Sequence, residues 1–185
     1  RIILGGGPAE GGWGTGKGAL MASRAAVVNL SNSQIEEGYY DGDLTWNSVL
    51  NATNCLFLAM DRAVSVQDGS TNLLVNCTVA DNRIGAFVHG GKLQAVNTII
   101  ANNSEAGVLD IYALDQSVFR FCDVWNPQAQ SGNYSGTHDA TGSNGNFSTD
   151  PRFKRPAQGS DRLDFGSSCT DAADGLSAPP ADFSA

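Results

Sequence analysis

The chain has 185 residues, of which 41% are hydrophobic and 16% are charged, so it can bury one continuous core. Its 19 acidic and 11 basic residues give a formal net charge of −8, which repels phosphate backbones, and we expect no nucleic-acid partner. No apolar run approaches the roughly 20 residues that span a bilayer, so we expect no membrane insertion. The chain begins at Arg1 without a signal peptide, which suggests a piece of a longer protein.

Residues 1–26 are rich in glycine, and we expect an irregular leading coil or edge there. From residue 27 a frame recurs in which an Asn precedes a small residue inside an alternating apolar stretch. The small residues of this frame are Ser33, Cys55, Cys77, Thr98 and Cys122, at intervals of 22, 22, 21 and 24. A period near 20 residues is typical of a solenoid built one coil at a time. The sequence therefore predicts an all-β, parallel β-helix over residues 27–126, with coils of about 21–24 residues; a β-sandwich is the alternative.

Strand alternation through this frame predicts which side chains point inward. The predicted inward positions are Val75, Cys77 and Val79, with Thr53, Cys55 and Phe57 below them and Val96, Thr98 and Ile100 above.

A second strand per coil is expected about ten residues later, at 63–67, 85–89 and 106–110. Its predicted inward rows are Val64, Ala86 and Gly107, and Val66, Val88 and Leu109. Polar residues separate the two strands, as sharp corners require. At these corners Asn82 is expected to lie over Asn103 and to begin an internal amide ladder.

The C-terminal part carries a different pattern, with FCDV at 121–124, DPRF at 150–153 and SSCTDAAD at 167–174. This pattern resembles the end of bacterial right-handed β-helix repeat proteins of the choice-of-anchor class, although Ser168, Thr170 and Ala173 depart from it. The resemblance implies a right-handed helix, a loop-rich C-terminal cap over residues 127–185, and an extracellular, secreted or cell-surface location.

The four cysteines lack the spacing of a zinc site, and we predict no metal site. Cys55 and Cys77 are predicted to stack in the core as free thiols, because small buried thiols pack as hydrophobic groups. Cys122 and Cys169 lie in the family-like cap region, and in an oxidising compartment we expect them to form a disulfide.

A ligand-binding site is predicted where Gln67, His89 and Asp110 fall on successive coils. Arg83 and Lys92 would lie at the flanking corners, and Phe87 is expected to point outward beside the row, where it could stack on a sugar. The alternative is that these are solvated residues at a strand end. We assign no catalytic residue.

The function that fits best is a scaffold module of a secreted or surface protein, with a structural, adhesive or filament-forming role and with carbohydrate contact. The alternative is a fragment of a β-helical polysaccharide lyase or glycoside hydrolase, since that fold hosts both activities; a carbohydrate-binding module without turnover is a third reading. Polysaccharides, other surface proteins and further copies of the chain are the expected partners. No cofactor is predicted, and no motif supports calcium.

Overall fold

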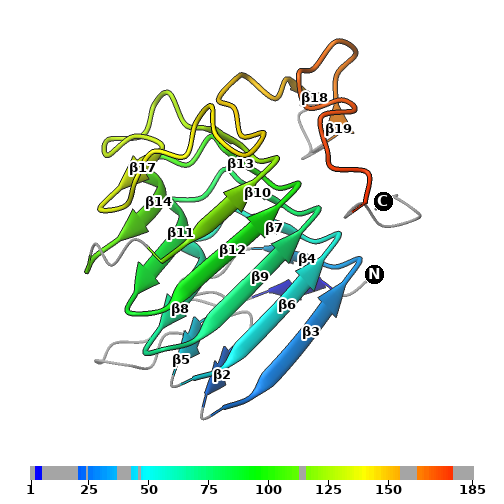
Figure 1. Cartoon of the computed structure of the whole chain (residues 1–185). Coiled ribbons are helices and arrows are strands. Elements are labelled where there is room, and N and C mark those ends of the chain that lie inside the picture. Colours follow the sequence, from blue (N-terminus) through cyan, green and yellow to red (C-terminus); the bar gives the residue numbers. More distant parts are fainter. Residues whose placement is uncertain are drawn as a thin grey trace.

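The computed structural model describes residues 3–5, 21–23, 25–36, 43–45, 47–112, 116–154 and 162–176. Their strands stack into three parallel sheets that wind as one solenoid (Figure 1). The described residues contain no helix, so none could cross a membrane. The predicted all-β, right-handed parallel β-helix is confirmed.

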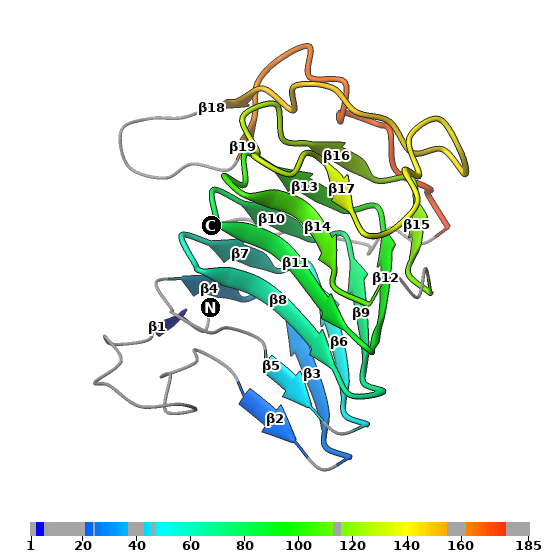
Figure 2. The ribbon, with the colours of Figure 1, turned by 90° about the vertical axis from the view of Figure 1, so that its left-hand side faces the viewer.

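Each sheet takes one strand from every coil (Figure 2). Sheet A contains β1 (Ile3–Gly5), β4 (Gln34–Glu36), β7 (Leu56–Leu58), β10 (Thr78–Ala80), β13 (Ile99–Ala101) and β16 (Asp123–Trp125). Sheet B contains β2 (Met21–Ser23), β5 (Asp43–Thr45), β8 (Arg62–Gln67), β11 (Ile84–His89), β14 (Ala106–Asp110) and β17 (Tyr134–Ser135). Sheet C contains β3 (Val27–Ser31), β6 (Val49–Thr53), β9 (Thr71–Val75), β12 (Lys92–Val96) and β15 (Val118–Arg120). β1 and β2 extend sheets A and B into the segment expected to be an irregular leading coil.

A complete coil has three strands, one more than the sequence predicted. The predicted alternating stretch is two strands separated by an Asn corner, at which Asn76 has a φ of 54°. Asn32, Asn54 and Asn97 have the same left-handed conformation, which Asn tolerates better than most residues. This corner resets the alternation, so Leu74 and Cys77 are both buried while Val75 is only half-buried. The inward positions predicted for Thr53, Val75 and Val96 were therefore wrong, whereas those of Cys55, Cys77, Val79 and Ile100 are confirmed.

One further register prediction was wrong, in sheet B. Val88 pairs with Asp110, and Ala86 pairs with Val108, so Val108 and Asp110 occupy the row positions predicted for Gly107 and Leu109. The coil interval is 21 between Asn82 and Asn103 but 22 between Ile84 and Ala106, because the later corner contains one additional residue. A slip of one residue sends every side chain of a strand to the opposite face.

The predicted internal amide ladder is confirmed at the corner between sheets A and B. Asn82 Nδ2 donates to Asn103 Oδ1 at 3.0 Å, and Asn103 Nδ2 donates to Asn126 Oδ1 at 2.9 Å. Asn126 in turn donates to Asn133 Oδ1 at 3.3 Å. The same oxygens accept backbone N–H groups from the coil below, as in the 3.1 Å bond from Asn82 N to Asn103 Oδ1. The ladder therefore satisfies buried backbone groups where the sheet hydrogen bonds stop.

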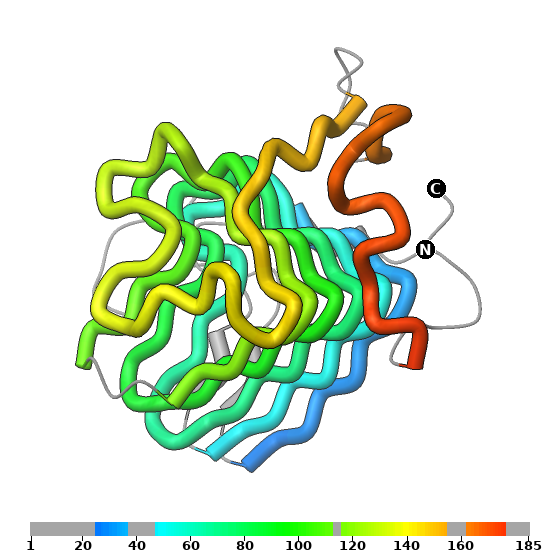
Figure 3. Tube along the Cα trace, turned by 45° about the horizontal axis from the view of Figure 1, so that its top comes forward, coloured from blue at the N-terminus to red at the C-terminus, as the bar shows by residue number. Residues whose placement is uncertain are grey.

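A loop-rich segment closes the C-terminal end of the solenoid. In Figure 3 the yellow part of the chain folds over that end, and the orange and red part, residues 162–176, runs along the outside of the stack. Asn146 Oδ1 accepts the Cys122 N–H at 3.0 Å, and Asn146 Nδ2 donates to the Phe119 carbonyl at 2.9 Å. Ala140 joins the core cluster, so this part of the cap packs on the last coil.

All four cysteines are free thiols, as predicted for Cys55 and Cys77. The predicted disulfide between Cys122 and Cys169 is not formed. Cys122 Sγ is buried and donates to the carbonyls of Arg120 and Ala95, at 3.2 and 3.3 Å, and burial raises the pKa of this thiol to about 11. Cys169 Sγ instead donates to Asp123 Oδ2 at 3.1 Å. Neighbouring residues of an extended segment project to opposite sides, so Asp123 and Cys122 present their side chains to different surroundings.

The alternation in β10 gives a direct test of the register. Val79 is fully buried between Phe57 of the preceding coil and Ile100 of the following coil. Val79→Asp therefore places an unpaired carboxylate in the core. We expect a loss of about 3 kcal/mol or more in the free energy of unfolding. Thr78→Asp, at the half-buried neighbouring position, should cost about 0.5 kcal/mol or less. Denaturant melts that showed equal costs would contradict the register.

Candidate functional site

The most varied side chains lie on the outer face of β8, β11 and β14, which we call the sheet B strip. It includes Arg62, Ser65, Gln67, Phe87 and His89 on the strands, the residues just before each strand, Asp61, Arg83 and Glu105, and Tyr112 just beyond β14. The parallel ladder of sheet B sets these side chains one coil apart, at a spacing of about 4.8 Å. The strip therefore depends on the register of the buried rows behind it.

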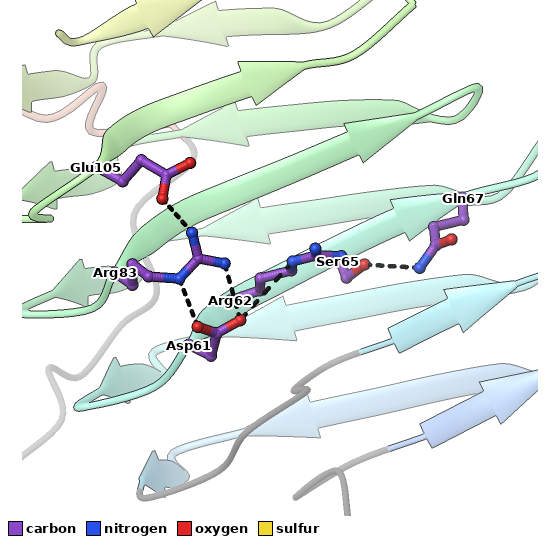
Figure 4. Close-up of polar contacts among 6 residues, drawn as sticks. All are labelled: Asp61, Arg62, Ser65, Gln67, Arg83 and Glu105. Carbon is purple, nitrogen blue, oxygen red and sulfur yellow. Dashed lines mark hydrogen bonds and ion pairs between the residues drawn. The ribbon is translucent and has the colours of Figure 1, made fainter. Parts of the chain in front are cut away.

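Three charged residues on successive coils form an ion triad at one end of the sheet B strip. Arg83 Nε donates to Asp61 Oδ1 at 2.5 Å and Nη2 to Asp61 Oδ2 at 3.0 Å, while Nη1 pairs with Glu105 (Figure 4). The hydrogen bond with Asp61 raises the pKa of Arg83 above its ordinary value. The Arg83 guanidinium is therefore occupied by two carboxylates of the scaffold, and its position does not support the predicted role in ligand binding.

Aromatic rings form a continuous stack along the same face. The Arg62 guanidinium carbon lies 3.9 Å from the centroid of the Phe87 ring, which is only 5% exposed. The Phe87 and His89 centroids are 6.1 Å apart, and the His89 and Tyr112 centroids are 4.4 Å apart with an interplanar angle of 28°. Tyr112 is 57% exposed, so the stack ends in an accessible ring. Tyr112 packs beside Gly90, whose φ of 74° lies in the region that favours glycine.

The structure brings together only some of the predicted ligand-binding residues. Gln67 and His89 pair across β8 and β11 as predicted. Asp110 pairs with Val88 instead of His89, is 3% exposed, and accepts the Tyr112 N–H at 3.2 Å, so it does not continue the predicted row beside His89. Phe87 lies on the outer face but is covered. Lys92 begins β12 in sheet C, across the turn from the sheet B strip.

Sequence reasoning missed two parts of the strip. The ion triad was visible as charges of alternating sign at intervals of 22 residues, from Asp61 to Arg83 and from Arg83 to Glu105. Tyr112 had no such signal, because it follows β14 in a connection to sheet C that is longer than those after β8 and β11. Within the described ranges, no three His, Cys, Asp or Glu side chains gather as a metal site.

A second polar cluster joins the cap to the last coil. Asp123 is 1% exposed; its Oδ1 accepts the Thr149 N–H at 3.0 Å and its Oδ2 accepts the Cys169 thiol. Burial raises the pKa of Asp123 to about 6, against the lowering effect of the Thr149 bond, and the charge of Asp150 adds to the rise. Farther along the cap, Asp174 N donates to Asn97 Oδ1 at 2.8 Å and Asn97 Nδ2 donates to the Asp174 carbonyl at 3.1 Å. Asp123 and Asn97 are therefore two separate anchors for the cap.

Comparison with protein-family models finds one match, to the right-handed β-helix region, over residues 13–147. No curated protein and no solved structure matches the chain. The matched span contains the regular coils of all three sheets and the sheet B strip.

Asp123 gives the stability of this protein a predictable dependence on pH. The pKa of Asp123 is raised from 3.8 to about 6 in the folded state. The contribution of Asp123 to the free energy of unfolding is therefore complete below pH 3.8 and is lost as the pH rises through 6. Asp123→Asn should remove this loss, so we expect the variant to gain about 1–3 kcal/mol relative to the parent between pH 4 and pH 7.

The matched control is Asp171→Asn, which replaces an exposed carboxylate of the cap at a position with a φ of 58°. Its free energy of unfolding should run parallel to that of the parent across this range of pH. Parallel curves for Asp123→Asn would show that Asp123 does not couple protonation to folding.

Proposed function

The chain belongs to the right-handed β-helix family, and from this premise we propose that it is a non-catalytic scaffold module of a secreted or surface protein whose outer face contacts carbohydrate. The observation that carries this proposal is the stack of Phe87, His89 and Tyr112, which ends in an exposed ring. Sugar rings present C–H groups that pack on such aromatic faces, and polar neighbours orient their hydroxyls. Gln67 and Ser65, joined by a 3.0 Å hydrogen bond, lie beside the stack.

The arrangement of charges in the sheet B strip favours a scaffold over the lyase or glycosidase alternative. A glycosidase needs two carboxyl groups free to act as acid and base on opposite sides of a sugar. Asp61 and Glu105 instead share Arg83 between them, and a guanidinium whose pKa is raised is a poor base. Buried ladders and satisfied corners, in contrast, are what a rigid spacer requires.

The proposal also includes a location and a closer kinship. The C-terminal motifs, from FCDV at 121–124 to the Asp-rich end at 171–174, favour a bacterial choice-of-anchor protein, and such proteins are exported. An exported scaffold meets glycans and other surface proteins, which are the partners that the outer face would contact.

Tyr112 is the residue whose removal tests carbohydrate contact. We expect the protein to bind a polysaccharide selected on a glycan array, with Tyr112→Ala weakening the affinity about tenfold and Tyr112→Phe retaining it. Affinity electrophoresis in the selected polysaccharide measures this difference, and Val118→Ala, at a side chain of sheet C that is 37% exposed, is the control.

Two results would count against the proposal. Equal affinities of Tyr112→Ala and the parent would remove the stack from the binding surface. Release of unsaturated or reducing sugar ends from a polyuronate, with or without calcium, would favour the enzyme alternative.

A further inference from the structure

An antiparallel hairpin stands outside the solenoid at its C-terminal end (Figures 1 and 2). It consists of β18 (Phe153–Lys154) and β19 (Arg162–Leu163), and Phe153 pairs with Leu163 while Lys154 pairs with Arg162. Phe153 and Leu163 are half-buried, whereas Lys154 and Arg162 are exposed. Residues paired directly across two strands share a face, so the hairpin has one apolar and one cationic face.

The charge of this hairpin is opposite to that of the rest of the chain. Its described residues, 151–154 and 162–166, carry three of the 11 basic residues and one of the 19 acidic residues, a net charge of +2. The remaining eight basic and 18 acidic residues give −10. A small cationic face on an acidic protein concentrates the attraction for anions at one place.

Two cations of the hairpin share a single carboxylate. Asp164 is shared between Arg152 and Lys154, at N–O distances of 3.7 and 3.8 Å, and all three side chains are between 45% and 57% exposed. Lys154 also lies directly opposite Arg162, and like charges at facing positions of an antiparallel pair destabilise it. The Lys154 and Arg162 side chains therefore lie on one face of the hairpin, and both are exposed.

An exposed aromatic ring adjoins the same cations. Phe165 is 93% exposed, and its N–H is held by Asp164 Oδ1 at 2.8 Å. Arg152 Nη1 donates to the Gly166 carbonyl at 3.2 Å, which fixes the turn that presents the ring. The hairpin therefore offers guanidinium and ammonium groups beside a flat apolar surface.

We infer that the cationic face of the hairpin, formed by Arg152, Lys154 and Arg162 with Phe165 beside it, binds an anionic polysaccharide. The cations would pair with its acidic groups while the phenyl ring packs on a sugar. A second copy of this chain, whose surface is also acidic, is the alternative occupant, and its binding would give salt-sensitive dimers. This site shares no residue with the Tyr112 stack, and the inference does not rest on carbohydrate contact there.

Dextran sulfate and dextran are matched probes, because they share a backbone and differ in anionic groups. We expect the protein to bind dextran sulfate but not dextran in affinity electrophoresis, and to lose about tenfold in affinity when NaCl rises from about 50 to about 300 mM. Arg152→Gln combined with Lys154→Gln should weaken binding about tenfold, and Phe165→Ser should weaken it by a smaller factor. Arg120→Gln removes an exposed cation from sheet C and should leave the affinity unchanged.

Three results would overturn the inference. They are equal binding of dextran and dextran sulfate, full affinity in the double Gln variant, and salt-sensitive dimers in light scattering that the double variant loses, which would identify a second copy as the occupant. Tyr112→Ala keeps its affinity for dextran sulfate if the two surfaces are separate, so failure here is distinguishable from failure of the proposed function.

Discussion

The corner between sheets A and B imposes the strictest constraint on this solenoid, because backbone groups are buried there while the chain changes direction. Asn103 meets this constraint with its whole amide: Oδ1 accepts the backbone and side-chain N–H groups of Asn82, and Nδ2 donates to Asn126 and to the Val79 carbonyl at 3.4 Å. An aliphatic residue of similar size could not replace these bonds, and a buried polar group without a partner costs about 1–3 kcal/mol. The ladder therefore places one Asn per coil at this corner from Asn82 to Asn126, and in the coil before it the Met60 N–H donates to Asn82 Oδ1 at 3.0 Å.

This constraint acts on the inward rows and leaves more freedom on the outer surface. The Asn row is kept although the connections differ in length from coil to coil. The turn at Gly90 is one residue shorter than the turn before Thr71, and the corner before Ala106 is one residue longer than the corner before Ile84. The additional residue brings Val108 and Asp110 into the inward rows. Side chains on the outer face are not held in such a row. Tyr112 and the hairpin of β18 and β19 can therefore differ from the repeat without disturbing the core. A stiff interior and an adaptable exterior are what a scaffold with surface contacts needs.

The repeat and much of the core could be predicted because hydrophobic alternation and corner Asn residues leave a periodic trace in the sequence. This periodicity predicted the inward row of Cys55, Cys77 and Thr98 and the ladder that begins at Asn82. Val75 was misplaced because nothing in its local sequence shows that Asn76 adopts a left-handed conformation instead of continuing the strand. The site was predicted less well for two reasons. A one-residue change in the length of a corner shifts a whole row of side chains, and a turn residue such as Tyr112 is not part of the repeat. Contacts made by the cap, such as that of Cys169, join residues far apart in the chain and leave no periodic signal.

The free energy of unfolding of Asn103→Ala, compared with that of Asn51→Ala, tests the central role of the buried ladder most directly. Both positions join two coils by an Asn–Asn hydrogen bond, but the 2.9 Å bond from Asn51 to Asn29 lies on the exposed surface, whereas Asn103 is 1% exposed. We predict a loss of about 3 kcal/mol or more for Asn103→Ala and about 0.5 kcal/mol or less for Asn51→Ala. Similar losses for the two variants would contradict the account, because the corner would then be held by something other than its buried amides.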